Sequence, residues 1–194
     1  MGRVKGFEMK EALGKAMNVF WEKGYEKTSL KDLLTAMDIL NGSFYNTFGN
    51  KKNLFIKALE FYGEEITSKR VAHITQNGSF KAGVRAFFES IYEGCEVSDG
   101  PSGCFLVNSL SGELLKDKDI LNFVQNAFQS FETFFQSELE KAVQSGELAA
   151  DLDTKMTGAL IVTYIQGAMK KASVSTPVED LKQQTQFFLN ALNI

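Results

Sequence analysis

The chain has only two prolines, Pro101 and Pro177, in 194 residues. Proline ends or kinks an α-helix, because it lacks a backbone N–H and its ring clashes with the preceding turn. Outside these two positions, apolar residues recur three and four places apart, which is the spacing of one face of a helix. The sequence therefore predicts an all-α protein, and its 44% of apolar residues suffices for a buried core.

The first helix is predicted over about residues 5–23. Gly24 supplies the left-handed residue that ends it, and Tyr25 is expected to pack back on Phe20. Six apolar residues form its buried stripe: Met9, Ala12, Leu13, Ala16, Met17 and Phe20.

Two short helices are predicted next. Ser29, with Asp32 three residues later, is the pattern of a capping box and starts the first of them. Leu40, Phe44, Tyr45 and Phe48 give the apolar pattern of the second, which ends at Gly49. Asn50 is then expected to cap a longer helix that runs through Ile66.

Residues 29–48 thus have the length and order of a helix-turn-helix, whose second helix enters the major groove of DNA. Asparagine and serine side chains can bond base edges, glycine permits close approach, and tyrosine, lysine and helix starts can bind phosphate. The residues expected to contact DNA are Thr28, Ser29, Asn41, Gly42, Ser43, Tyr45, Asn46 and Lys52. An ordinary helical hairpin with polar residues facing water is the alternative on periodicity alone.

Charge is distributed unevenly along the chain. The formal net charge is −3, which alone argues against a nucleic-acid partner. Residues 1–60 nevertheless hold ten Lys and Arg against seven Asp and Glu, whereas residues 61–194 hold eleven against seventeen. A basic front end on an acidic body is expected when only the front end meets phosphates.

Two runs, residues 24–30 (GYEKTSL) and 41–54 (NGSFYNTFGNKKNL), closely resemble the DNA-binding signature of the TetR/AcrR family of regulators. The resemblance implies a homodimer with about nine helices per chain, DNA read by the third helix, an effector pocket in the C-terminal part, and repression of transcription. A two-fold dimer would bind a near-palindromic operator. One departure is Asp38 in the turn, where the family commonly has a small residue such as Gly, but Asp tolerates left-handed geometry better than most residues.

We place a domain boundary at residue 50, with a helix-turn-helix DNA-binding domain at 1–50 and an effector-binding and dimerisation domain at 51–194. Further helices are predicted over residues 80–95, 103–115, about 123–139, 153–172 and 177–192. A loop is expected from Glu96 to Pro101. Ser102 is the predicted cap of the helix at 103–115. Thr176, with Pro177 in the first turn and Glu179 as capping-box acid, is the predicted cap of the last helix.

Aromatic residues with a few polar groups among them suit an apolar effector pocket. The predicted ligand-binding residues are Phe61, Phe88, Tyr92, Cys104, Asn108, Phe128, Phe131 and Tyr164. Small residues among apolar ones in the last two helices suit a dimer interface, with Leu160, Tyr164, Gly167, Leu181 and Phe188 as its predicted residues. In both cases the alternative is an ordinary core within one chain.

Cys104 follows the predicted cap Ser102, at the second position of a predicted helix. A helix N-terminus lowers the pKa of a thiol and favours the thiolate, so Cys104 could sense an electrophile or an oxidant. A short segment, residues 103–108 (GCFLVN), is also similar to a subset of the family that includes regulators of responses to electrophiles and drugs. A small cysteine buried between helices is the commoner role.

Other classes are disfavoured. There is no Cys or His cluster with metal-ligand spacing, and we expect no metal and no cofactor. No segment has the length of a membrane span or the pattern of a signal peptide, which predicts a cytoplasmic protein without a membrane partner. An enzyme with Cys104 as nucleophile is one alternative, but His73 is alone and no base accompanies Cys104, so we predict no catalytic residues. A helical adaptor that binds protein is the other.

Overall fold

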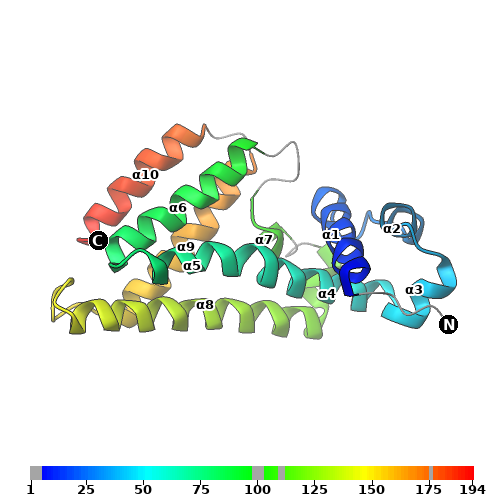
Figure 1. The fold of residues 1–194 in the computed structure, drawn as a ribbon, viewed down its shortest axis with the longest axis horizontal. Helices are drawn as coiled ribbons and strands as arrows, with labels where there is room; N and C mark the ends of the chain where they lie inside the picture. Colours follow the sequence, from blue (N-terminus) through cyan, green and yellow to red (C-terminus); the bar gives the residue numbers. More distant parts are fainter. Residues whose placement is uncertain (1–5, 98–102, 109–111, 175–176) are drawn as a thin grey trace. The chain divides into compact units, whose positions relative to one another are not determined.

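The computed structural model describes residues 6–97, 103–108, 112–174 and 177–194, and most of these residues are helical (Figure 1). No β-strand occurs in these ranges, which confirms the all-α prediction. Packing divides the chain into two compact units, one of Met1–Thr67 with Phe105–Phe123 and one of Ser68–Cys104 with Val124–Ile194. A packing unit is not the same as a functional domain, so the domain boundary at residue 50 stays a prediction.

The first unit is built on helices α1 (Gly6–Lys23), α2 (Leu30–Met37), α3 (Asn41–Phe48) and α4 (Lys51–Tyr62). A π-helical segment, Gly63–Thr67, follows α4. The short helix α7 (Phe105–Asn108), a 3-10 turn (Gly112–Lys116) and the start of α8 (Lys118–Gln144) complete the unit. Helix α1 packs against α2 and α4, while α3 and α7 pack against α4.

The residues at the C-terminal ends of α1 and α2 adopt the conformations predicted from the sequence. Gly24 has φ +76°, and its N–H donates to the carbonyl of Phe20 at 2.9 Å. The ring of Tyr25 stacks on that of Phe20 with centroids 6.0 Å apart. Asp38 takes the left-handed conformation at φ 54°, ψ 48°, and so makes the turn between α2 and α3. Each of these residues ends its helix where the sequence indicates.

The apolar pattern of α3 is corrected by the structure. Phe44 and Phe48 are buried at 1% and 4% exposure, but Leu40 is 79% exposed and Tyr45 is 51% exposed. Leu40 lies before the helix, at the N-cap, with φ −78° and ψ 152°. Because an N-cap residue has non-helical backbone angles, the helical period does not fix the direction of its side chain.

The second unit contains α5 (Ser68–Gln76), α6 (Phe80–Val97), most of α8, α9 (Thr154–Ala172) and α10 (Val178–Ala191). Its core is largely aromatic and aliphatic, and Phe87, Phe135, Ile161 and Leu181 are each at most 2% exposed. Helix α5 packs against α6, and α10 packs against α6 and α9. None of the helices in the described ranges is long and apolar enough to cross a lipid bilayer.

Several predicted boundaries differ. Helix α4 ends at Tyr62 and continues as the π-helical segment, where one helix was expected through Ile66, and α8 extends beyond its expected span of about 123–139 at both ends. The helix expected at 103–115 is instead the one-turn helix α7 and a 3-10 turn, because Gly103 and Gly112 have φ +87° and +56° and interrupt a continuous helix. Helix α6 continues to Val97, where a loop was expected from residue 96. Pro177 is the N-cap of α10 rather than a first-turn residue, and it makes no side-chain cap bond. The expected caps Ser102 and Thr176 lie outside the described residues.

Candidate nucleic-acid interface

Helix α3 presents five of the eight predicted DNA-binding residues on one exposed surface. Asn41, Gly42, Ser43, Tyr45 and Asn46 are all exposed. A Cβ built on Gly42 would meet no atom within 4 Å, so the backbone here is open to close approach. The buried side of the same helix is held in the core of the first unit. The structure therefore offers short polar side chains on a fixed helix.

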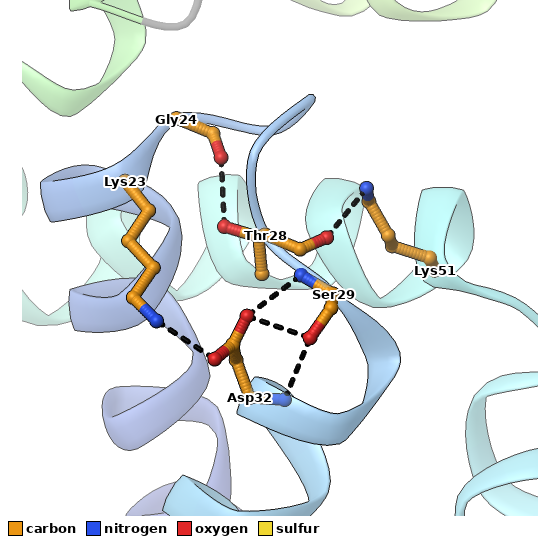
Figure 2. Close-up of polar contacts among 6 residues, drawn as sticks. All are labelled: Lys23, Gly24, Thr28, Ser29, Asp32 and Lys51. Carbon is orange, nitrogen blue, oxygen red and sulfur yellow. Dashed lines mark hydrogen bonds and ion pairs between the residues drawn. The ribbon is translucent and has the colours of Figure 1, made fainter.

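The start of α2 is held by the hydrogen-bond network drawn in Figure 2. Thr28 is 1% exposed, and its hydroxyl donates to the carbonyl of Gly24 at 2.7 Å. The carbonyl of Thr28 accepts a bond from Lys51 Nζ at 2.7 Å. A direct contact of the Thr28 hydroxyl with DNA, as the sequence predicted, does not fit this placement. Thr28 instead joins the end of α1 to the start of α4.

Ser29 is exposed and forms the predicted capping box with Asp32 (Figure 2). Its hydroxyl accepts from the Asp32 N–H at 3.1 Å, and the Ser29 N–H donates to Asp32 Oδ2 at 2.9 Å. Lys23 Nζ lies 2.7 Å from Asp32 Oδ1. The hydrogen bond from Lys23, followed by those from Ser29, holds the pKa of the Asp32 carboxyl well below its usual range.

Lys51 has a structural role that could not be predicted from the sequence. Its ammonium lies 4.3 Å from the ring centroid of Tyr25, which is a cation–π contact, and donates to the Thr28 carbonyl. Partial burial lowers the pKa of Lys51. Nothing in the local sequence pattern could have shown this contact, because Tyr25 and Lys51 are brought together by the packing of α1 on α4.

Lys52 is placed differently from its prediction as a phosphate contact. Its Nζ lies 2.8 Å from Asp117 Oδ2 and 2.6 Å from Asp119 Oδ2. These hydrogen bonds raise the pKa of Lys52, and the bond to Lys52 lowers the pKa of Asp117. Asp117 also caps α8 by accepting from the N–H groups of Asp119 and Ile120. In this structure the Lys52 charge is already paired with carboxylates.

The predicted effector residues are divided between the two units. Phe61 lies in the first unit, where its ring faces Gly14 of α1, and Asn108 is at the end of α7 in the same unit. Phe88, Tyr92, Phe131, Tyr164 and Cys104 belong to or pack against the core of the second unit. Phe128 is half-buried on α8 in that unit. The structure therefore brings together five of the eight residues.

Three hydroxyl groups meet inside this second-unit cluster. The Tyr92 hydroxyl bonds Thr185 Oγ1, which is 3.0 Å from the hydroxyl of Tyr164 and donates to the Leu181 carbonyl at 2.9 Å. Burial raises the pKa of Tyr92 to about 12. The Tyr164 ring lies 5.8 Å from Phe88, centroid to centroid. Thr185 was missed because one buried threonine on an otherwise polar helical stretch carries no distinctive pattern.

The cysteines do not fit the predicted thiolate site. Cys104 precedes α7 instead of standing inside a helix, and α7 has only four residues, so the argument from a helix N-terminus is wrong. Cys104 is half-buried and packs against the core of the second unit. Cys95 is also half-buried, and the two are not bonded to each other. His73 is exposed on α5.

The predicted dimer residues are only partly on the surface. Leu160 is 44% exposed, Gly167 is exposed, and Tyr164 and Phe188 are half-buried. Leu181 is fully buried in the core of its own chain, so its prediction as an interface residue is corrected. Phe187, which was not predicted, is 77% exposed one position before Phe188.

The fold and the exposed α3 define the class of protein: a helix-turn-helix DNA-binding regulator. Residues 12–58 match the family described as "Bacterial regulatory proteins, tetR family". Residues 81–188 match the "Tetracyclin repressor-like, C-terminal domain". The chain belongs to the TetR family of transcriptional regulators, which confirms the resemblance found in the sequence.

Relatives and solved structures agree with this membership. The HTH-type transcriptional repressor ComR of Escherichia coli is 30% identical over 183 residues, which cover 94% of this chain and 87% of ComR. The HTH-type regulator YezE of Bacillus subtilis is 31% identical over 148 residues, 76% of each chain. A cysteine mutant of the TetR-family regulator CifR, complexed with 26-base-pair operator DNA, is 28% identical with a TM-score of 0.88, covering 97% of this chain and 99% of that one.

Proposed function

We propose that this chain is a repressor that binds a near-palindromic operator as a homodimer and leaves it when an effector binds in the second unit. The observation that carries the proposal is the exposed polar surface of α3, anchored by the buried rings of Phe44 and Phe48. The similarity to CifR, which was solved with its operator, supports it. Family membership also favours a regulator over the enzyme and the adaptor considered from the sequence.

Each exposed residue of α3 suits one kind of DNA contact. The amides of Asn41 and Asn46 suit the N6 and N7 positions of adenine, and the Ser43 hydroxyl can either donate to or accept from a base edge. Gly42 lets the helix backbone approach the groove, and the Tyr45 hydroxyl reaches phosphate. Ser29, exposed at the start of α2, adds a backbone contact.

The homodimer is supported by an apolar face on α9 and α10. Met156, Leu160 and Phe187 are 58%, 44% and 77% exposed, which is unusual for large apolar side chains in water. Phe187 lines a shallow hollow together with Tyr164 and Phe188. A second copy with the same face would cover these residues by a two-fold contact and present two α3 helices to the DNA.

The effector we propose is an apolar or aromatic molecule that carries one hydrogen-bonding group. Phe88, Tyr92 and Tyr164 are aromatic residues of the second-unit core, and three hydroxyls lie among them. Because Phe88 and Tyr92 are only 2% and 1% exposed, the effector would have to open this packing to reach them. The second candidate is an electrophile or oxidant that modifies Cys104. One observation favours it: Cys104 is followed directly by Phe105, which is 1% exposed in the aromatic core of the first unit.

The repressor proposal is tested by fluorescence anisotropy of the protein on duplexes from the region flanking its gene, across a salt series. We expect one fragment to bind tightly, with an affinity that falls as salt rises, and the double variant Asn41→Ala, Tyr45→Ala to lose this binding. The matched control is Gln125→Ala, Gln129→Ala, an exposed pair with the same spacing on α8. Equal binding of every fragment and of scrambled DNA at low salt would remove the basis of the proposal.

The two effector candidates are separated by a second measurement on the protein–DNA complex. Treatment with the thiol oxidant diamide releases DNA from the wild type but not from Cys104→Ser if Cys104 is the sensor. If diamide releases DNA from both the wild type and Cys104→Ser, or from neither, the result favours the aromatic effector. The matched control is Cys95→Ser, because Cys95 is also half-buried.

A further inference from the structure

Leu40 is the most exposed large apolar side chain among the described residues, at 79%. It lies between the left-handed Asp38 turn and the first residue of α3, with an extended backbone. The hollow between α1, α2 and α3 is lined by Ile39 and Ser43 but not by Leu40. Packing within the chain therefore does not account for a leucine at this position.

Helix stability does not account for it either. Leu40 is the N-cap of α3 and makes no side-chain cap bond, and leucine is among the poorest residues for this role. The same chain uses good caps elsewhere, with Ser29, Asn50 and Asp153 accepting bonds from backbone N–H groups at 3.1, 2.8 and 2.9 Å. At α3 a serine or asparagine would serve the fold better.

The neighbours of Leu40 indicate what it contacts. Asn41, Gly42 and Tyr45 are exposed on the helix that the proposed function places in the major groove. The N-terminal residues of such a helix contact base edges. The major groove has one apolar feature, the C5-methyl group of thymine, and apolar side chains recognise it by contact.

We propose that Leu40 is a specificity-determining residue that packs against a thymine methyl group in each half of the operator. The proposal rests on the proposed function, because it needs α3 to lie in the major groove. Polar residues of α3 then read donors and acceptors, while Leu40 selects a thymine next to them. Removal of one methyl group from an apolar contact weakens binding about fourfold.

The test uses duplexes selected by the full-length protein from a random double-stranded library. Each thymine in the selected half-site is replaced in turn by uracil, which lacks only the methyl group. We expect about a fourfold loss of affinity at one position per half-site for the wild type. Leu40→Ala should bind the uracil duplex as the wild type does, and should show no preference for thymine there. Leu115→Ala, an exposed leucine in the same unit, is the matched control and should keep the preference.

A stability measurement accompanies the binding measurement. Leu40→Ser supplies the missing cap, so we expect its Tm to rise by about 2–4 °C while the thymine preference is lost. The inference is overturned if the wild type prefers thymine over uracil at no position, or if Leu40→Ala keeps the wild-type preference. If the protein selects no duplex at all, the proposed function fails and the inference fails with it, a result distinct from the first two.

Discussion

Asp32 contributes to the start of α2 through its charge as well as through its hydrogen bonds. Both carboxylate oxygens are engaged, one by Lys23 and the other by Ser29. A carboxyl whose pKa is lower in the folded state stabilises the fold above its unfolded pKa, and this contribution is lost as pH falls through the folded pKa. Because the pKa of Asp32 is lowered, its contribution to stability is lost over a pH range on the acid side of the ordinary pKa of an aspartate.

We therefore expect Asp32→Asn to be less stable than the wild type at neutral pH, with a difference that shrinks below about pH 4. Urea unfolding of both proteins over a pH series measures this difference. Asp151→Asn, at an exposed position, is the control and should show no such trend. A difference that stays constant with pH would mean that the charge of Asp32 does not contribute.

For single residues, the sequence predicted the interactions between neighbours in the chain but not the contacts that form when helices pack together. The capping box of Ser29 with Asp32 and the left-handed Asp38 depend on residues within a few positions, so their pattern was sufficient. The burial of Thr28 depends on Lys51, which comes from α4, and no pattern near Thr28 shows it. Leu40 was wrongly assigned to the buried side of α3, because the helical period does not extend to the N-cap residue.

Among the elements, the junction before α8 holds the ammonium of Lys52, a residue that the sequence predicted as a phosphate contact. Asp117 and Asp119 pair with Lys52, near the start of α4, and so compete with any phosphate for that ammonium. Release of Lys52 would add about one phosphate contact and make binding more dependent on salt. The sequence could not show this pairing, because Lys52 and Asp119 are 67 residues apart.

We expect Asp117→Asn, Asp119→Asn to bind non-specific duplex DNA more tightly, with a salt slope steeper by about one. Asparagine at 117 can still cap α8, so the fold should persist. The control Asp151→Asn, Glu140→Gln changes the net charge equally at exposed positions of the second unit. An identical rise in both double variants would assign the effect to net charge and contradict a role for the Lys52 pairs.

Helix α7 contributes one buried ring to the aromatic core of the first unit. Phe105 lies 5.7 Å from Trp21 and 5.7 Å from Phe55, between ring centroids. The indole N–H of Trp21 is buried, and no described residue accepts a hydrogen bond from it. Trp21 is the one tryptophan in the chain, and its fluorescence reports on this core alone.

We expect Phe105→Leu to destabilise the protein by about 1–3 kcal/mol, because it removes part of a buried ring. It should also shift the Trp21 emission to longer wavelength, because the loosened core admits water. Phe134→Leu, a half-buried ring on α8 that contacts Phe135, should destabilise without the emission shift. Unchanged Trp21 emission in Phe105→Leu would show that α7 does not shape this core.

The spans of the helices were predicted better than the segments that connect them. Helices α1, α2, α3 and α9 lie within about a residue of their predicted spans, since each has a clear period and a glycine, aspartate or serine at an end. The helix expected at 103–115 failed because its apolar residues have helical spacing although Gly103 and Gly112 are left-handed. Glycine permits the left-handed conformation but does not require it, so a glycine in the sequence does not show that a helix ends there.

For the whole molecule, the surface that we propose for dimerisation is the exposed face of α9 and α10. Small and apolar residues predicted an interface there, but periodicity did not separate the buried Leu181 from the exposed Phe187. That distinction depends on how α10 packs against α6 and α9, which is a property of the folded chain.

We expect Leu160→Glu, Phe187→Glu to weaken self-association about thirtyfold or more, because two charges would be buried without partners. Sedimentation equilibrium measures the change, and operator affinity should fall with it. Leu115→Glu, at an exposed leucine of the first unit, is the control and should associate as the wild type does. Unaltered association in the double variant would place the interface elsewhere.

The proposed function requires two copies of α3 to bind one operator, and a hydroxyl-radical footprint on the selected duplex shows whether they do. We predict two protected segments related by a two-fold axis and centred about one helical turn, or a multiple of it, apart. Both should be lost in Asn41→Ala, Tyr45→Ala and kept in Gln125→Ala, Gln129→Ala. A single asymmetric protected segment, or protection that survives the change of Asn41 and Tyr45, would contradict binding of the operator by two α3 helices.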